Sequence, residues 1–467
     1  MTDKELFKSL TNERKSAYLI MSDEEKQEMN SLCDAYRCFL DNGKTERECV
    51  REAIKLAESA GFVNLDKLDT IKAGDKVYKL NRNKNILMAV IGSEDIRKGI
   101  NIAGAHIDSP RLDLKQNPLY ESTDMAWLKT HYYGGIKKYQ WPTIPLAIHG
   151  VIYNEKGEKV EIIIGEDEND PVFVITDLLP HLAKDQMSKK MVEGIEAENL
   201  NILVGGMPIE AEDIKETVKF SVLKMLNARY GIRERDFLSA EIEIVPAQKA
   251  KNVGLDESFV GGYGQDDRVC AYTTLRGILT VDNPKHTAVA ILVDKEEIGS
   301  TGNTGAQSAF MTMTVAELIK KANGDCTVVD LNETIQASAC MSSDVSAAVD
   351  PNFLSVSEEN NSCYAGYGVA IMKYTGSRGK YDSSDANAEF VHEIGELMDK
   401  DGVVWQTGEL GKVDQGGGGT IAQYVANLNM DVIDCGVPVL SMHSPFEITA
   451  KSDIYMAYRA FKAFYKR

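Results

Sequence analysis

The chain of 467 residues has no apolar run long enough to cross a membrane and no excess of positive charge. No stretch approaches the ~18 apolar residues of a membrane helix, and the first residues, MTDKELFKSL, lack the apolar segment of a signal peptide. Its 52 basic and 71 acidic residues give a net charge of −19, whereas a nucleic-acid surface must be positive. These absences predict a cytoplasmic protein that binds neither membranes nor nucleic acid.

The sequence also lacks a cysteine pattern typical of disulfide-rich or zinc-finger domains. Its eight cysteines are scattered along the chain, so we expect reduced and mostly buried thiols. Cys33 and Cys38 lie close together, but no second Cys/His pair of zinc-finger spacing follows them. The length of the chain favours two domains over one.

Apolar strand-like runs and helical patterns alternate over residues 1–115 and again over residues 247–467. This alternation predicts an α/β fold with a mainly parallel central sheet flanked by helices. Residues 116–246 are richer in β-like runs, such as the hairpin LAIHGVIYNEKGEKVEIIIG. We therefore expect one α/β domain formed by residues 1–115 and 247–467, interrupted by an inserted β-rich domain in which residues 192–213 form a polar loop.

Histidine or acidic residues stand at five predicted strand-to-loop junctions. They are His106 and Asp108, Asp266, Glu296 with Glu297, Asp344, and His443. Taken alone, each has a plainer interpretation, such as a surface histidine or a helix-capping aspartate. If the sheet is doubly wound, several of these strand ends converge on one edge, and we expect the side chains there to meet. So many carboxylates in one place would be destabilising without cations.

A pair of divalent metal ions is the natural counter-charge for this cluster. Histidine and carboxylate ligands without cysteine suit zinc, and also manganese or cobalt. Glu296 and Glu297, expected at the end of a strand, would point different ways, so that one binds metal and the other acts as general base. Asp108 lies two residues after His106, where it can hydrogen-bond the imidazole.

Five motifs in this order, AHIDSPRLDLK, GQDDRVCAYTTL, DKEEIGSTG, SSDVSAAVDPNF and MHSPFEI, resemble the aspartyl aminopeptidase family of dinuclear metalloaminopeptidases. The resemblance spans essentially the whole chain and implies that the interrupted α/β domain is a catalytic domain with a zinc exopeptidase-like fold. It implies one metal held by His106 and Asp344, a second held by Glu297 and His443, and a bridge by Asp266, which a cis peptide often follows. It also implies that Glu296 is the general base and that Asp108 supports His106.

The resemblance further implies that the insertion is a dimerisation domain and that the subunits form a tetrahedral dodecamer. His181, in TDLLPHLAKDQ, would reach into a neighbouring subunit's active site. Lys373 would meet an acidic substrate side chain, although Ala347 stands where some relatives have histidine. Gly418 lies in DQGGGGTIAQYVA, which resembles a substrate-binding loop and lacks the Lys-Ser/Thr of a nucleotide P-loop.

Our hypothesis is an aminopeptidase that removes one N-terminal residue from peptides, preferably an acidic one, through a metal-bridging water and the base Glu296. One alternative is a two-metal deacylase or carboxypeptidase acting on small amides. Another is an aminopeptidase that prefers neutral residues. A third is a protein whose metals only stabilise its fold.

Overall fold

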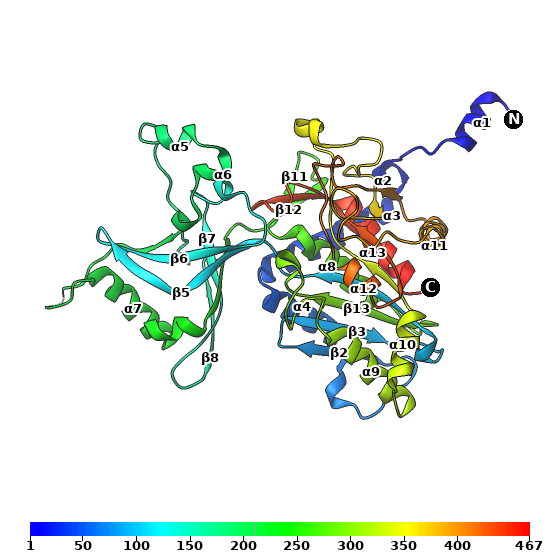
Figure 1. Cartoon of the computed structure of the whole chain (residues 1–467), viewed down its shortest axis with the longest axis horizontal. Coiled ribbons are helices and arrows are strands. Elements are labelled where there is room, and N and C mark those ends of the chain that lie inside the picture. The colour runs from blue at the N-terminus through cyan, green and yellow to red at the C-terminus, as the bar shows by residue number, and fades with distance from the viewer. Residues whose placement is uncertain (211) are drawn as a thin grey trace. The chain divides into compact units, whose positions relative to one another are not determined.

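The computed structural model describes residues 1–210 and 212–467 and divides them into two compact units. The first unit comprises Met1–Asp108, Ala250–Met442 and Glu447–Arg467, and the second comprises Ser109–Lys249 and His443–Phe446. The chain therefore enters the second unit at Ser109 and leaves it at Lys249, where the sequence predicted an insertion over 116–246. Figure 1 shows the elements of both units by residue number.

A nine-stranded sheet forms the centre of the first unit. Its strands, in spatial order, are β1 (Val63–Asn64), β2 (Lys76–Asn81), β3 (Asn85–Val90), β13 (Thr287–Val293), β4 (Ile100–His106), β14 (Ala339–Ser342), β18 (Asp431–Gly436), β16 (Val369–Met372) and β17 (Trp405–Thr407). The four central strands, β13, β4, β14 and β18, run parallel to one another, and β1 and β2, like β16 and β17, also pair in parallel. The predicted mainly parallel α/β fold is confirmed.

A smaller five-stranded sheet also belongs to the first unit. It contains β11 (Lys251–Val253), β12 (Phe259–Gly262), β20 (Glu447–Ala450), β19 (Pro438–Leu440) and β15 (Ser346–Ala347). The unit's helices are α1 (Asp3–Leu10), α2 (Ala17–Ile20), α3 (Asp23–Asn42), α4 (Glu46–Ser59), α8 (Gln265–Leu279), α9 (Phe310–Asn323), α10 (Val328–Gln336), α11 (Ala388–Lys400), α12 (Ala422–Ala426) and α13 (Lys451–Phe464).

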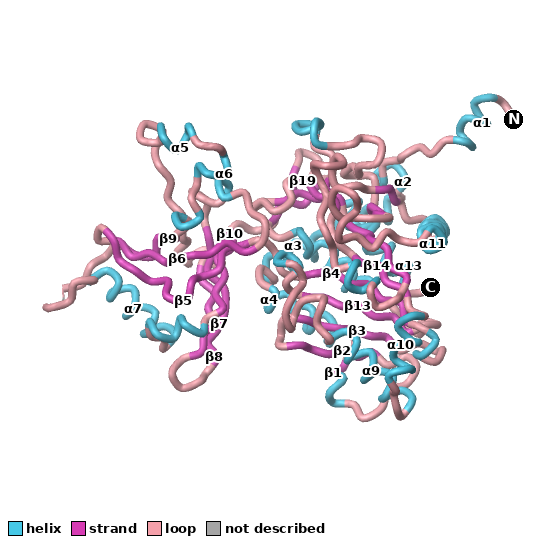
Figure 2. Tube along the Cα trace, viewed as in Figure 1, coloured by secondary structure: helices cyan, strands magenta, loops and turns pink. Residues whose placement is uncertain are grey.

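Alternate residues of the central strands face two separate hydrophobic cores, because successive strand side chains point to opposite faces. In β13, Ala290 and Leu292 pack with the core that contains residues of α3, α4, α8 and α13. Val289 and Ile291 pack with residues of α9 and α12 on the other side. Both faces of the sheet are thus covered, which explains why its central strands are continuous apolar runs (Figures 1 and 2).

The second unit is built on a six-stranded antiparallel sheet. Its strands are β8 (Lys159–Ile164), β7 (Leu146–Tyr153), β10 (Glu241–Pro246), β5 (Arg111–Ser122), β6 (Met125–Tyr133) and β9 (Ile202–Gly205), and its helices are α5 (Lys184–Ser188), α6 (Met191–Gly194) and α7 (Thr217–Tyr230). The predicted hairpin is β7–β8. The predicted loop over 192–213 was wrong in part, because β9 pairs with β6 there and completes the sheet.

Two further findings bear on the sequence predictions. All eight cysteines are free thiols, but Cys38 is exposed and Cys326 is only partly buried. Among the described residues, no helix is both long and apolar enough to span a bilayer.

Candidate metal centre

Three neighbouring parallel strands end at the same edge of the large sheet. His106 is the last residue of β4 and is in register with Val293, the last residue of β13. On the other side of β4, Ser342 ends β14 in register with Gly104, and Asp344 follows two residues later. The sheet therefore brings His106, Asp344 and the segment after β13 to one place.

Asp266 reaches the same place from the first turn of α8. The helix is anchored there by Arg268, whose guanidinium donates hydrogen bonds to the carbonyl oxygens of Ile107 (3.4 Å) and Lys44 (2.8 Å). The peptide between Asp266 and Asp267 is cis. The backbone N–H of Asp266 donates to Glu447 Oε2 at 3.1 Å, so the start of α8 is held from two directions.

Carboxylate oxygens lie close to both ring nitrogens of His106. Its Nδ1 lies 3.2 Å from Asp108 Oδ1 and 3.0 Å from the Asp108 carbonyl oxygen. Its Nε2 lies 3.3 Å from Asp266 Oδ1, and 3.8 Å from both Glu296 Oε2 and Asp344 Oδ1. A neutral imidazole that donates through Nδ1 carries its lone pair on Nε2, which is the state of a metal ligand.

Asp108 also fixes the segment that carries the two glutamates. Its Oδ1 accepts a hydrogen bond from the backbone N–H of Glu296 (3.1 Å), and its Oδ2 accepts one from that of Glu297 (3.2 Å). The prediction that the glutamates end a strand was wrong. The strand stops at Val293, Lys295 adopts a left-handed conformation with φ of 68°, and Glu296–Ile298 forms a single 3₁₀ turn.

The electrostatics of the cluster are those expected for carboxylates that require a counter-charge. Burial, and then the charge of Asp344, raise the pKa of Glu296 to about 8. Burial raises the pKa of Asp267 well above its usual range, and Asp344 adds to the shift. For His106, burial alone would lower the pKa, but the nearby carboxylates of Asp108, Asp266 and Asp344 outweigh this effect and raise the pKa. A divalent cation would favour the ionised carboxylates and reverse these shifts.

The donor set fits a divalent metal on geometric grounds. Ligand atoms of His106, Glu296 and Glu297 lie within 4.8 Å of one another, as do those of His106, Asp267 and Asp344. His106 Nε2 is buried and makes no hydrogen bond, although three carboxylate oxygens lie 3.3–3.8 Å away. Leaving such a nitrogen without a hydrogen bond is costly unless it coordinates an ion.

Asp267 is the residue of this cluster to which the sequence analysis gave no role. It is fully buried, and its Oδ2 accepts a hydrogen bond from the backbone N–H of His106 at 3.3 Å. The adjacent acids in GQDDRV were the available signal, but the pattern could not tell that both of them would face His106. Asp294 was also missed. It is buried, accepts from Thr304 Oγ1 at 2.7 Å, and burial raises its pKa to about 7.

His443 lies in the turn between β19 and β20, and its contacts place it with the second unit. There its Nδ1 lies 2.7 Å from the carbonyl oxygen of Gly135. Donation through Nδ1 directs the lone pair to Nε2, as in His106. The strand before His443 belongs to the five-stranded sheet, whereas the strands before His106 and Asp344 belong to the nine-stranded sheet.

The predicted substrate-binding residues occupy different surroundings. His181 is exposed, in a turn just before α5 of the second unit. Lys373 follows β16 in the first unit and forms an ion pair with Asp385. The carbonyl oxygen of Gly418 accepts a hydrogen bond from the backbone N–H of Gly376 at 2.7 Å, and a side chain at Gly418 would meet no atom within 4 Å.

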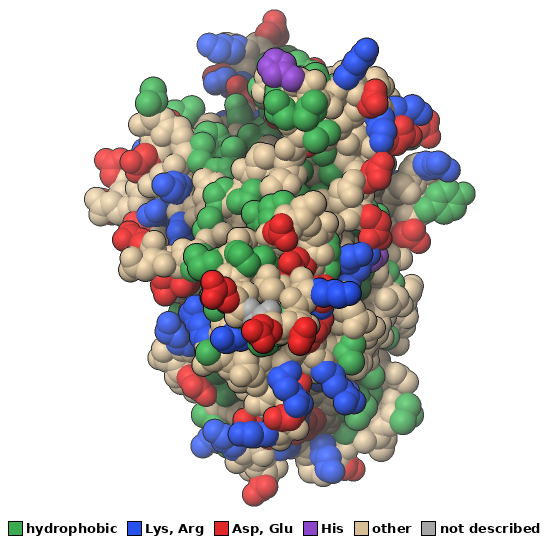
Figure 3. Space-filling view, turned by 90° about the vertical axis from the view of Figure 1, so that its left-hand side faces the viewer, with side chains coloured by type: hydrophobic (Ala, Val, Ile, Leu, Met, Phe, Trp, Pro, Cys, Tyr) green, Lys and Arg blue, Asp and Glu red, His purple; other side chains and the backbone are tan. Residues whose placement is uncertain are grey.

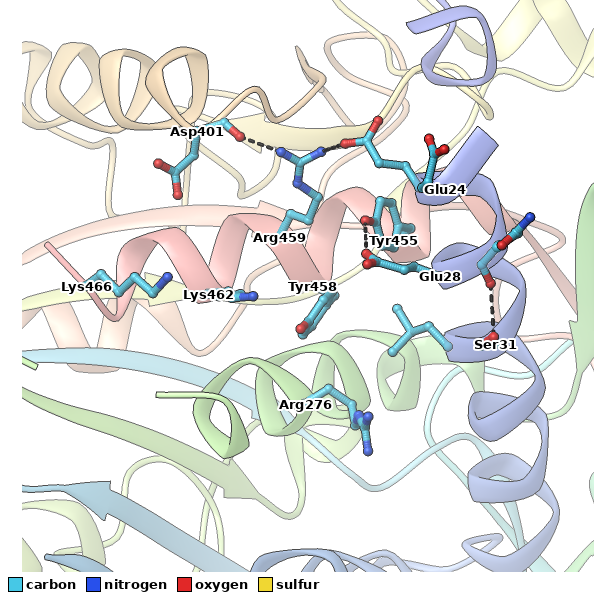
Figure 4. A pocket seen from close by; sticks show the side chains of 13 residues that line it. Glu24, Glu28, Ser31, Arg276, Asp401, Tyr455, Tyr458, Arg459, Lys462 and Lys466 are labelled. Atoms are coloured by element: carbon cyan, nitrogen blue, oxygen red, sulfur yellow. Dashed lines mark hydrogen bonds and ion pairs between the residues drawn. The ribbon is translucent and has the colours of Figure 1, made fainter. Parts of the chain in front are cut away.

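A pocket of about 840 Å³ on the first unit lies apart from these residues. Side chains of α3, α8 and α13 line it, and its wall is held by Tyr455, which donates to Glu28 at 2.7 Å, and by Arg459, which pairs with Glu25 (Figure 4). None of the predicted site residues lines it, and its lining includes no histidine. It is therefore not the candidate metal centre.

The fold and the His-carboxylate cluster define an α/β protein with a candidate site for divalent cations. A sequence model of the M18 family, described as aminopeptidase I zinc metalloprotease, matches residues 39–465. The chain belongs to this family. Members of the family are zinc metalloproteases and aminopeptidases, and therefore hydrolases.

Individual relatives agree with this assignment. The "Probable M18 family aminopeptidase 1" of Clostridium acetobutylicum is 52% identical over 459 residues, which are 97% of this chain and 98% of the relative. The crystal structure of an M18-family aminopeptidase from Thermotoga maritima superposes with a TM-score of 0.94 at 45% identity, covering 98% of this chain and 100% of that one. The S. cerevisiae mApe1 dodecamer shares the fold, with a TM-score of 0.76 at 18% identity over 94% and 97% of the two chains.

Proposed function

We propose that this member of the M18 family is an aminopeptidase that uses two divalent metal ions, preferably zinc, to hydrolyse the first peptide bond of peptides. The observation that carries the proposal is the buried Nε2 of His106, which faces Asp266, Glu296 and Asp344 while Asp108 holds the opposite nitrogen. Manganese and cobalt accept the same ligand types, so either could replace zinc.

The ligands of the two ions are proposed from the motifs and from the cluster. His106 and Asp344 would hold one ion, Glu297 and His443 the other, and Asp266 would lie between them. When bound, such ions polarise a peptide carbonyl and make water more acidic. Asp108 contributes by fixing His106 and the backbone of the glutamate turn, so that both ligand groups are oriented before substrate arrives.

Glu296 is the proposed general base. Its Oε2 lies 3.8 Å from His106 Nε2, and its side chain is largely buried among other carboxylates. It would take the proton from the attacking water and deliver it to the nitrogen of the leaving amine. Proton transfer by a positioned carboxylate typically contributes about 10²–10⁴ in rate.

Acidic N-terminal residues are the proposed preference, with Lys373 as the partner of the substrate carboxylate. The loop that contains Gly418 would contribute backbone contacts, because a side chain there would meet no protein atom within 4 Å. A preference for neutral residues is the alternative, and it has support of its own, because Lys373 is already paired with Asp385.

We also propose that the second unit mediates dimerisation within a homo-oligomer, a tetrahedral dodecamer acting in the cytoplasm, with His181 reaching a neighbouring active site. Large apolar side chains are exposed in the part of the unit that carries His181, namely Leu178, Leu182, Met187, Met191 and Val192, each 53–75% exposed. Such side chains support burial against another subunit. The face seen in Figure 3 displays hydrophobic side chains between charged ones.

The test is hydrolysis of matched peptides that have a free C-terminal carboxylate and either a free or an acetylated N-terminus. Zinc-loaded protein should release the first residue of the free-amine substrates only. Cleavage of the acetylated substrates at a similar rate would favour the deacylase or carboxypeptidase alternative. Zinc bound without any hydrolysis would favour metals that only stabilise the fold.

A further inference from the structure

We infer that Asp385 sets how strongly the enzyme discriminates between acidic and neutral N-terminal residues, so that both classes are substrates. This inference rests on the proposed aminopeptidase function. It concerns the counter-ion of the two lysines that the sequence places after β16, and not the lysines themselves.

One carboxylate is shared by two lysines in this segment. Asp385 Oδ1 lies 2.6 Å from Lys373 Nζ, and Asp385 Oδ2 lies 3.0 Å from Lys380 Nζ. The side chains of the three residues are 46%, 42% and 44% exposed, in the order Lys373, Lys380 and Asp385. Both cations are therefore partly neutralised, while all three groups remain accessible to a ligand.

The surrounding loop holds Asp385 in this position. Ser383 Oγ accepts hydrogen bonds from the backbone N–H of Asp385 (3.3 Å) and from that of Thr375 (3.1 Å). The Lys380 ammonium lies 3.8 Å from the centre of the Tyr374 ring, within the range of a cation–π contact. Backbone hydrogen bonds and a cation–π contact of the loop therefore support the bridge that Asp385 forms between the two lysines.

The same loop is connected to the candidate metal centre through α12. The backbone N–H of Gly376 donates to the carbonyl oxygen of Gly418 at 2.7 Å, in the glycine-rich segment that precedes α12. From α12, Tyr424 Oη donates to the carbonyl oxygen of Gly299 at 3.4 Å, just after the Glu296 turn. Burial, and then the negative charge of Glu296, raise the pKa of Tyr424. The lysines and the proposed base therefore belong to connected segments.

The charges explain why the discrimination should be partial. Two lysines and one aspartate leave one net positive charge for a substrate carboxylate. That carboxylate would lie beside Asp385, and two carboxylates sharing one site repel each other. An exposed ion pair is weak, so the substrate can compete with Asp385 without excluding neutral residues.

The experiment measures kcat/KM for glutamyl and leucyl amides with the zinc-loaded full chain. D385N should raise the glutamyl-to-leucyl ratio about tenfold, mainly through a lower KM for the glutamyl substrate. D385E, which restores the charge, should return the ratio toward the original value. The matched control is D282N, which removes an acid paired with Lys76 at 2.9 Å elsewhere in the unit and should leave the ratio unchanged.

Combining D385N with K373M should abolish the gain, because the released lysine is then missing. An unchanged ratio in D385N overturns the inference, and so does an equal loss for both substrates, which would indicate a structural role only. Failure of the proposed function looks different, because the unmodified zinc-loaded chain would then hydrolyse neither amide.

Discussion

The side chain of Asp108 holds the backbone of Glu296: Asp108 Oδ1 accepts a hydrogen bond from the Glu296 N–H at 3.1 Å. The other carboxylate oxygen accepts the N–H of Glu297, and the Asp108 carbonyl oxygen lies 3.0 Å from His106 Nδ1. Asp108 therefore orients the proposed ligand His106. It also orients the turn that carries the proposed ligand Glu297 and the proposed base Glu296. The Glu296 carboxylate takes no part in these hydrogen bonds, so it can act as the proposed base.

Substitution D108N should weaken metal binding by about 10–100-fold, because the amide NH₂ cannot accept the second backbone N–H. Zinc affinity measured by titration against a competing chelator would show it. D113N is a suitable control, because Asp113 pairs with Arg111 at 2.8 Å within the second unit. Zinc affinity equal to that of the unmodified protein would contradict the role given to Asp108.

Substitution E296Q should leave zinc bound and lower kcat by about 10²–10⁴, because the amide has the shape of the carboxylate but cannot take a proton. Metal content and kcat are measured on the same sample. E393Q, which alters an exposed acid paired with Arg467, should keep full activity. Activity retained in E296Q would remove Glu296 from the mechanism.

The glycine-rich loop offers a matched pair of substitutions. At Gly417, which has φ of +107°, a Cβ atom would lie 2.0 Å from the Gly376 carbonyl oxygen, whereas at Gly418 it would meet nothing within 4 Å. G417A should lower the free energy of unfolding by more than about 1 kcal/mol. G418A should keep the stability and raise KM if the backbone contacts substrate. Thermal denaturation and KM separate these effects, and an unchanged KM in G418A would argue against substrate contact.

Asp453 should make the stability of the first unit depend on pH. It accepts hydrogen bonds from the backbone N–H groups of Gly366 (2.7 Å) and Gly368 (2.8 Å), yet burial raises its pKa to about 7. The folded state binds the proton more tightly than the unfolded chain, whose aspartates titrate near pH 3.9. The stabilisation is therefore complete below about pH 4 and is lost as the pH rises through about 7.

Chemical denaturation of the unmodified chain and of D453N between pH 4 and pH 8 tests this sign. The free energy of unfolding of the unmodified chain should fall relative to that of D453N over this range. Curves that stay parallel would show that Asp453 has the same pKa in the folded and unfolded states.

The sequence predicted the residue types and the main strands of the candidate site, but not its local geometry. The apolar run before His106 is a strand that ends where predicted, because a strand buried on both faces gives a continuous apolar signal. The run before Glu296 extends the same pattern, but Lys295 takes a left-handed conformation and the strand ends at Val293. Neighbouring polar residues carry no periodic signal from which such a turn could be predicted.

The inward orientation of Asp267 and the grouping of His443 with the second unit were also beyond reach of the sequence. Both depend on contacts between segments distant in the chain: Asp267 accepts from the N–H of His106, and His443 contacts Gly135. Periodicity within one segment reports which face is buried, but not which distant backbone group a buried carboxylate will accept.

The most direct test of the metal centre is anomalous diffraction at the zinc edge from crystals of the zinc-loaded protein. Two peaks are expected, about 3.5–4 Å apart, one next to His106 and Asp344 and the other next to Glu297 and His443. Fully loaded crystals with no peak beside His106, or with zinc bound only elsewhere, would contradict the central claim that this buried carboxylate cluster is the catalytic metal site.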